Sequence, residues 1–306
     1  MVNGIINVYK EAGFTSHDVI AKMRGIIGFR HIGHTGTLDP MAEGVLPVCI
    51  GSATKVCDML TDKVKEYEAE ILFGTATDTE DITGNVKKTL PVFACKEDLI
   101  NVFPLFLGEI MQTPPMYSAI KLNGQKLYDL AREGKEVAVA KRKVRIDDIR
   151  LLGVTCDEEG HLKDAKIKVV CGKGTYIRSL CRDLGEALNT CACMKSLYRT
   201  KTDRFEMKDA LRLSDLQELK DKGELEAHIL PIDQYFSDYE AFSTLPEFDH
   251  LVNNGNPIRK REAVFERPIK DFYRAYDSKG QFCGVYKFDR EHGKFRPDKM
   301  FLEVYS

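Results

Sequence analysis

The segment YEAEILF, residues 67–73, decides the fold class. Tyr67, Ala69, Ile71 and Phe73 are apolar or aromatic, and two of the three residues between them are glutamates. Such an alternation with a period of two is typical of a strand whose one face packs on a hydrophobic core. The segment therefore predicts a sheet with this strand inside it.

Helical and strand patterns are mixed on both sides of this segment. After Ser16, which can cap a helix, apolar residues recur at helical spacing up to Ile27, and residues 176–188 show the same spacing. Residues 45–50 and 144–154 are typical of strands. Because no regular β-α-β rhythm emerges, the pattern favours an α+β fold with a mixed or antiparallel sheet over a doubly wound fold.

The C-terminal part has a different character. Residues 231–246 are rich in Asp, Ser, Tyr and Pro, which is typical of a connector. Residues 265–286 alternate aromatic and apolar side chains and contain turn signals. We therefore expect a large domain over residues 1–240 and a small β-rich domain over residues 245–306.

Composition narrows the class of protein. The 306 residues are 43% hydrophobic and 30% charged, as in a globular protein. No apolar run is long enough to span a bilayer, and no basic start with an apolar core indicates export, so we expect a cytoplasmic protein. Nine cysteines without a second closely spaced pair predict reduced thiols and no zinc site.

The net charge of −2 does not indicate nucleic acid, but two stretches are locally basic. A run of basic residues is most often a solvated surface, and each stretch alone favours that interpretation. Two stretches, one with aromatic residues, make RNA binding a hypothesis worth testing. The stretches are Lys121–Arg150, with four of its nine Lys and Arg residues within Lys141–Arg145, and Arg259–Arg261 with Arg267, Lys270, Arg274, Phe265, Phe272 and Tyr273.

A loop with several glycines, GHTGTLDPMAEG (residues 33–44), joins the first helix to an apolar strand. Scaffolds often place functional residues in such loops. Asp39 precedes Pro40 and by local pattern alone would simply begin a turn. Neither this loop nor the Gly172–Thr175 segment has the glycine spacing of a phosphate-binding loop.

The segment GHTGTLDPMAEGVLPVCIG, residues 33–51, resembles the catalytic motif of the TruB-type tRNA pseudouridine-55 synthases. Four further motifs of the family occur in the same order, and together the five cover about the first two thirds of the chain. Glu11, Tyr198 and Asp203 depart from the family pattern. The C-terminal segment resembles the family's RNA-binding PUA domain only weakly. The four further motifs are residues 4–19, 65–84, 113–134 and 172–185.

The resemblance implies isomerisation of the uridine at position 55, in the T loop of tRNA, to pseudouridine. The bond from ribose C1′ to uracil N1 breaks, and C1′ is rejoined to C5. Nothing is added or lost, so we expect no cofactor and no metal. The reaction needs an ionised carboxylate that attacks C1′ or removes the C2′ proton, and the sequence leaves both routes open.

The resemblance assigns three residues to the chemistry. Asp39 is the carboxylate, and Arg178 is the cation that keeps it charged. Tyr67 stacks on the uracil and helps to move the C5 proton. The alternative interpretations are an exposed helix charge for Arg178 and a core aromatic for Tyr67.

Four more residues are implied to bind the substrate. His34 takes the place of the extruded uridine, although a lone loop histidine is ordinarily a surface residue. Tyr176 and Leu197 line the base pocket, although each is also typical of a core. Lys10 supports either the pocket or a phosphate.

The expected partner is the T stem-loop of tRNA, with no membrane, no obligatory protein partner and a monomeric chain. Two alternatives remain: a synthase of the same fold for another RNA uridine, and a tRNA-folding chaperone with secondary activity. Pure binding would not require Asp39, Tyr67 and Arg178 together. A general RNA-binding protein would leave residues 33–40 unexplained.

Overall fold

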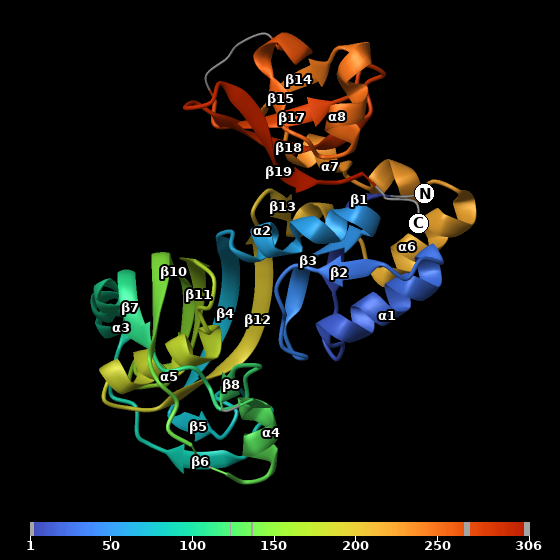
Figure 1. Cartoon of the computed structure of the whole chain (residues 1–306). Helices are drawn as coiled ribbons and strands as arrows, with labels where there is room; N and C mark the ends of the chain where they lie inside the picture. Colours follow the sequence, from blue (N-terminus) through green and yellow to red (C-terminus); the bar gives the residue numbers. More distant parts are fainter. Residues whose placement is uncertain (1–2, 123, 136, 266–269, 303–306) are drawn as a thin grey trace.

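The computed structural model describes residues 3–122, 124–135, 137–265 and 270–302. Two main sheets organise these residues (Figure 1). The larger sheet contains β1 (Gly4–Lys10), β2 (Ile32–His34), β3 (Glu43–Ile50), β4 (Lys65–Phe73), β7 (Gly108–Gln112), β10 (Arg142–Cys156), β11 (Leu162–Cys171), β12 (Ala192–Thr202) and β13 (Phe205–Glu206).

The larger sheet is mixed. Its main path runs β1-β3-β12-β4-β11-β10-β7, with β2 attached to β3 and β13 to β12. Neighbouring strands are antiparallel except β12 and β3, which pair in parallel through Tyr198↔Glu43 and Arg199↔Gly44. The α+β arrangement that the sequence predicts is therefore confirmed.

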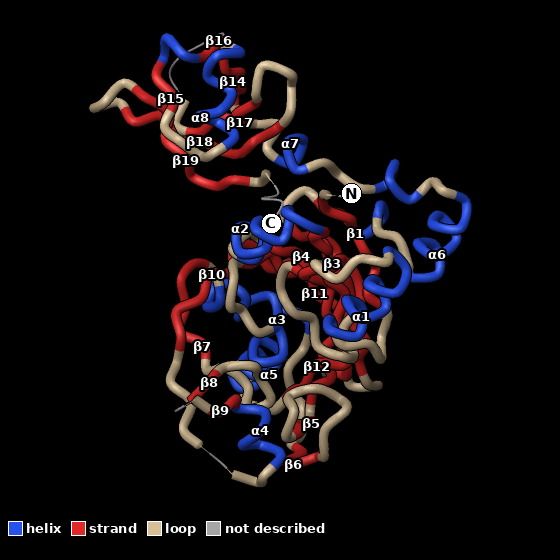
Figure 2. Tube along the Cα trace, turned by 45° about the vertical axis from the view of Figure 1, so that its right-hand side comes forward, coloured by secondary structure: helices blue, strands red, loops and turns tan. Residues whose placement is uncertain are grey.

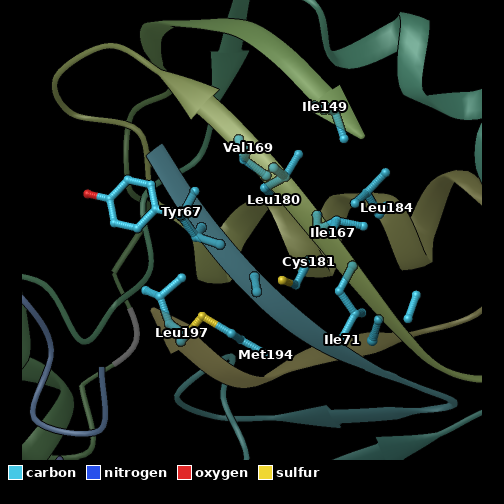
Figure 3. Packing of buried hydrophobic residues seen from close by; sticks show 14 of the residues in the cluster. Tyr67, Ile71, Ile149, Ile167, Val169, Leu180, Cys181, Leu184, Met194 and Leu197 are labelled. Atoms are coloured by element: carbon cyan, nitrogen blue, oxygen red, sulfur yellow. The ribbon is translucent and has the colours of Figure 1, made fainter. Parts of the chain in front are cut away.

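Strand β4 lies inside this sheet and buries the alternating face of residues 67–73. These side chains belong to one hydrophobic cluster with helix α5 (Ile177–Ala187), which contributes Leu180 and Leu184 (Figure 3). Transfer of such side chains from water stabilises the fold by about 1.5–3 kcal/mol each. The central strand and its covering helix thus form one rigid support.

Helix α1 (Ser16–Ile27) packs on the larger sheet, because its buried side chains share one cluster with Ile6 and Val8 of β1. Its first turn is capped by the side chain of Thr15, and it ends at Gly28, which has φ 74°. The expected cap, Ser16, has another partner: its buried hydroxyl accepts a hydrogen bond of 3.0 Å from the N–H of Leu38. This contact fixes the helix to the loop that contains Asp39.

The other elements are short. The helices are α2 (Cys57–Thr61), α3 (Lys96–Val102), α4 (Leu127–Arg132), α6 (Leu213–Lys222), α7 (Ile232–Tyr235) and α8 (Asp249–Asn253). Two hairpins stand outside the main sheets: β5 (Thr75–Thr77) with β6 (Val86–Thr89), and β8 (Lys121–Leu122) with β9 (Gln125–Lys126). None of the helices in the described ranges is long and apolar enough to cross a membrane.

The C-terminal sheet has the order β15-β19-β18-β17-β14-β16 and is separate from the larger one (Figures 1 and 2), but Val285 of its β18 packs in one cluster with Ile5 and Val45. It begins at Glu240, inside the segment expected to be a connector, because Phe242 packs in its core. Arg267 lies outside the described residues. The strands are β14 (Glu240–Thr244), β15 (Ile258–Arg259), β16 (Ala263–Phe265), β17 (Phe272–Tyr276), β18 (Phe282–Asp289) and β19 (Lys294–Met300).

The aromatic residues of the second basic stretch are largely structural. Tyr273 is fully buried, and Phe265 stacks edge-on against Phe295 at a centroid distance of 5.5 Å. Phe272 stacks on Tyr239. These rings fill the C-terminal core and its edge, and the fully buried ring of Tyr273 is not exposed to a bound RNA.

Candidate active site

Residues 35–42, here called the Asp39 loop, connect β2 to β3. The loop is fixed by bonds to its backbone: Leu38 donates to Ser16, and Gly13 donates to the carbonyl of Pro40 at 2.9 Å. The N–H of Ala42 closes a turn on the carbonyl of Asp39 at 3.0 Å. A loop held at so many points presents its carboxylate in one orientation.

Lys10 stabilises the Asp39 loop through hydrogen bonds to its backbone. Its side chain is fully buried, and its ammonium donates to the carbonyls of Glu11, Pro40 and Ala42 at 3.2, 3.2 and 2.6 Å. Burial lowers the pKa of Lys10 to about 8, although Asp39 partly opposes the shift. Because three carbonyls occupy its three protons, the geometry fits loop support and does not fit the alternative of a phosphate contact.

Arg199 holds the other side of the loop. It is fully buried on β12, and its Nε donates to the carbonyl of Val45 at 2.7 Å and its Nη2 to that of Gly36 at 3.2 Å. Arg199 was not predicted as a site residue, because an arginine between polar residues is typical of a solvated strand.

Asp39 and Arg178 form a two-pronged ion pair. The Nε of Arg178 lies 2.8 Å from Oδ2 of Asp39, and its Nη2 lies 3.0 Å from Oδ1. The arginine side chain is 5% exposed, whereas that of the aspartate is 35% exposed. Such a paired fork fixes the position of a carboxylate and places a full positive charge beside it. Arg178 is therefore not the exposed helix charge of the alternative interpretation.

The remaining donors of Arg178 bind two further segments. Its Nη1 donates to the carbonyl of Thr79 and its Nη2 to that of Tyr117, both at 2.9 Å. Asp81 adds a carboxylate oxygen 4.0 Å from Nε. One guanidinium thus joins the Asp39 loop, the turn after β5 and the segment before β8.

Tyr67 lies on β4 and Leu197 on the neighbouring strand β12, where both pack near the Asp39 loop. Both belong to the cluster that also contains Leu38 and Ala42 of the loop. Figure 3 shows Tyr67 at the end of this cluster, with its phenolic oxygen turned away from the aliphatic side chains. Burial raises the pKa of Tyr67, and the charge of Arg199 opposes the shift. The ring is a core residue whose hydroxyl faces polar groups.

Tyr176 precedes α5, two residues before Arg178. Its N–H donates to Oε1 of Gln112 at 2.9 Å, and its carbonyl accepts from Nε2 of the same side chain at 3.0 Å. The ring is half-buried, and burial raises the pKa of its hydroxyl. The Gln112 clamp fixes the start of the helix that carries Arg178.

His34 ends β2 at the start of the loop. Its half-buried ring meets the edge of His17 at a centroid distance of 5.5 Å. Burial lowers the pKa of His34, and the charge of His17 adds to the shift. Within the described part of the chain, Nδ1 is buried without a hydrogen-bond partner. His34 and Lys10 thus lie at the edges of the site, whereas Asp39, Arg178, Tyr67 and Leu197 meet at its centre.

Other expected features can be located as well. In the described ranges no three His, Cys, Asp or Glu side chains are placed to hold a metal ion. All nine cysteines are free. In the first basic stretch, Lys143 pairs with Glu109 at 2.6 Å and Arg145 with Asp147 at 2.5 Å. These surface pairs reduce the positive charge that this stretch offers to a phosphate backbone.

Comparison with known proteins decides the family. Residues 24–177 match the model of the TruB family pseudouridylate synthase N-terminal domain, and residues 178–237 match that of the tRNA pseudouridylate synthase B C-terminal domain. The chain belongs to the TruB family of pseudouridylate synthases. It is 48% identical to tRNA pseudouridine synthase B of Lachnoclostridium phytofermentans over 98% of this chain and 100% of that protein.

Further relatives agree with this assignment. Identity to tRNA pseudouridine synthase B of Clostridium perfringens is 39% over 99% of the chain and 100% of that protein. A structure of an H/ACA RNP bound to a substrate RNA containing 2′-deoxyuridine contains a chain of the same fold, with a TM-score of 0.70 and 24% identity. That match covers 99% of this chain and 86% of the other. The predicted family, pseudouridine synthase fold and enzyme class are confirmed.

Proposed function

We propose that this TruB-family enzyme isomerises the uridine at position 55 in the T loop of tRNA, with Asp39 as the carboxylate that acts on the ribose. One observation carries the proposal: a buried arginine holds both oxygens of Asp39, and the pair lies beside Tyr67 and Leu197. The printed names of the relatives, tRNA pseudouridine synthase B, support the RNA class.

The ion pair suits the first step. When the bond from C1′ to N1 breaks, the electron pair leaves with the uracil, and C1′ becomes electron-poor. A carboxylate can bind C1′ covalently or remove the proton at C2′, and either role requires it to be ionised. Arg178 donates to both oxygens of Asp39 and holds the carboxylate in one orientation.

Tyr67 and its neighbours suit the second step. The detached base must turn over so that C5 faces C1′, and the C5 proton must then be removed. In this proposal the Tyr67 ring stacks on the base, and its hydroxyl takes part in the proton transfer. Leu197 and Tyr176 provide the apolar wall and the rim of the pocket, and exclude water during the rearrangement.

The substrate uridine has to leave its stack before it reaches Asp39. Extrusion costs about a few kcal/mol for a paired or stacked base. In the proposal His34 fills the space that the uridine vacates, which offsets part of this cost. Lys10 acts indirectly, because it supports the Asp39 loop.

In this proposal the enzyme acts as a monomer, without an obligatory protein partner, in the cytoplasm. Support comes from the site itself: the Asp39 loop, β4, α5 and β12 of a single chain bring the ion pair of Asp39 and Arg178 together with Tyr67 and Leu197. No step of the isomerisation requires a group that a second chain would bring.

The test combines product mapping with a pair of variants. The purified chain is incubated with an unmodified tRNA transcript and with its isolated T stem-loop, and pseudouridine is mapped at single-nucleotide resolution. Product at position 55 in both RNAs is expected for the wild type and for Asp62→Asn, an exposed aspartate that pairs with Lys173. Asp39→Asn should bind RNA with similar affinity but form no product. Product at another uridine, or turnover by Asp39→Asn, would contradict the proposal.

A further inference from the structure

Arg199 is a buried cation for which the described residues offer no ion pair. Its guanidinium donates to two backbone carbonyls, of Val45 and Gly36. A buried charge that lacks an opposite charge is costly, and a fold retains one only where other interactions compensate. The two carbonyls compensate in part, but they do not explain why an arginine is present in place of an apolar side chain.

The register of the sheet places Arg199 between two parts of the site. In the β12–β4 pair, Arg199 is directly opposite Tyr67, and in the β12–β3 pair it is opposite Gly44. Directly opposed residues of neighbouring strands point to the same face of a sheet. Arg199 therefore shares a face with Tyr67, next to the strand that follows the Asp39 loop.

The guanidinium reaches both neighbours. Nε binds the carbonyl of Val45 in β3 and Nη2 that of Gly36 inside the Asp39 loop, and Nη1 lies 3.6 Å from the position of a Cβ on Gly36. Because Arg199 is directly opposite Tyr67 in the β12–β4 pair, its positive charge acts on the Tyr67 phenol as well. The Arg199 side chain therefore connects the Asp39 loop to the strand position opposite Tyr67.

The charge of Arg199 also acts on its surroundings. It lowers the pKa of Tyr67, against the larger effect of burial, and contributes to the lowered pKa values of Lys65 and His34. A phenol that takes part in proton transfer works best when its pKa is not far from the working pH. The positive charge of Arg199 therefore counteracts the rise in the pKa of Tyr67 that burial causes.

We propose that Arg199 is a positioning residue that acts through Tyr67, holding the phenol toward the base and coupling its position to the Asp39 loop. This inference rests on the proposed chemistry, in which Tyr67 meets the target base, but it is independent of which RNA supplies the uridine. A purely structural arginine would support β12 and β3 regardless of the Tyr67 hydroxyl.

A double-mutant cycle separates these two roles. Single-turnover rates are measured with excess enzyme for the wild type, Arg199→Lys, Tyr67→Phe and the double variant. Arg199→Lys should lower the rate about tenfold in the Tyr67 background but less than about threefold in the Phe background, because its partner atom is already absent. Equal losses in both backgrounds would overturn the proposal. Arg204→Lys, just beyond β12, is the matched control and should leave the rate unchanged.

A second measurement covers the case in which Tyr67→Phe has no measurable rate. The ζ-carbon NMR resonance of Tyr67 is assigned by its loss in Tyr67→Phe and titrated with pH. In Arg199→Met the titration should move to higher pH than in the wild type, because the nearby cation is lost. An unmoved titration would overturn the role of Arg199.

The experiments distinguish an error in the proposed function from an error in this inference. If position 55 is not modified, the same cycle is run on whichever uridine the wild type modifies in bulk tRNA. A lost product at position 55 with intact coupling between Arg199 and Tyr67 would contradict only the RNA assignment. Product at position 55 with independent effects of the two substitutions would contradict only the inference.

Discussion

Gly44 packs against the backbone of Arg199 so closely that a Cβ on Gly44 would lie 2.3 Å from the Arg199 carbonyl oxygen. Its φ of 106° also lies in the region that favours glycine. The contact occurs where β3 and β12 run in parallel, directly after the Asp39 loop. The close approach of β3 and β12 therefore depends on glycine, which has no side chain, at position 44.

Gly44→Ala should lower the free energy of unfolding by about 3 kcal/mol or more, because backbone strain and a clash with backbone atoms add together. Urea denaturation measures the loss. Gly13→Ala is the matched control, since Gly13 has φ 87° but no atom within 4 Å of its added Cβ. It should cost only the strain, about 1–2 kcal/mol. Equal costs for both variants would show that the strands can separate.

Arg178→Lys should lower kcat by about 10- to 100-fold, while KM changes little. A lysine keeps the positive charge but cannot bind both oxygens of Asp39 and also reach the carbonyls of Thr79 and Tyr117. Steady-state kinetics measure the effect. Arg182→Lys, one turn further along α5 and paired with Glu80, is the control. If both variants lose the same activity, the fork on Asp39 has no special role.

The sequence predicts the fold best where one face of an element is buried. The alternation of residues 67–73 correctly indicated β4, and helical spacing indicated α1 and α5. Strand β12 was not predicted, because its sequence ACMKSLYRTKT carries three cations and no clear alternation. Its pairing with β3 and β4 comes from segments far away in the chain, which a local pattern does not contain.

The same reason limits prediction of the site. Asp39 and Arg178 are 139 residues apart, and only the family resemblance indicated that they pair. Lys10 was identified without its role, because its carbonyl partners belong to a loop whose conformation depends on tertiary contacts. Arg199 was missed since a buried arginine is indistinguishable in sequence from an exposed one.

Lys10 should make stability depend on pH in the alkaline range. Its pKa falls from 10.5 in an ordinary lysine to about 8 in the folded chain, because it is buried. Between these values the unfolded chain binds more protons than the folded one, so the free energy of unfolding rises with pH. The shift corresponds to at most roughly 3 kcal/mol.

Urea denaturation at about pH 7.5, below the pKa of folded Lys10, and at about pH 9.5, inside that window, tests this. The wild type should gain stability relative to Lys10→Met as the pH rises, although the variant also loses the bonds to the loop. Lys163→Met removes an exposed lysine and should follow the wild type. A parallel pH dependence of the wild type and Lys10→Met would show that Lys10 keeps its proton throughout.

The role of His34 can be separated from proton transfer. If its ring fills the space left by the extruded uridine, His34→Ala should slow the reaction on a structured T stem-loop by up to about 1–3 kcal/mol, part of the cost of extrusion. On an RNA whose uridine is already unstacked, the same substitution should matter less. His31→Ala, which removes an exposed histidine bonded to Thr54, should have no effect on either RNA.

The pH dependence of kcat/KM tests whether a proton on His34 takes part in the reaction. Burial and His17 lower the pKa of His34 below its ordinary 6.5, so the ring is neutral at and above neutral pH and can stack without losing a proton. The profile of kcat/KM should therefore have the same shape in the wild type and in His34→Ala. Loss of an acidic limb in the variant, or an equal defect on both RNAs, would make His34 an acid or base. An unchanged rate on both RNAs would leave it a residue of the loop edge that no step requires.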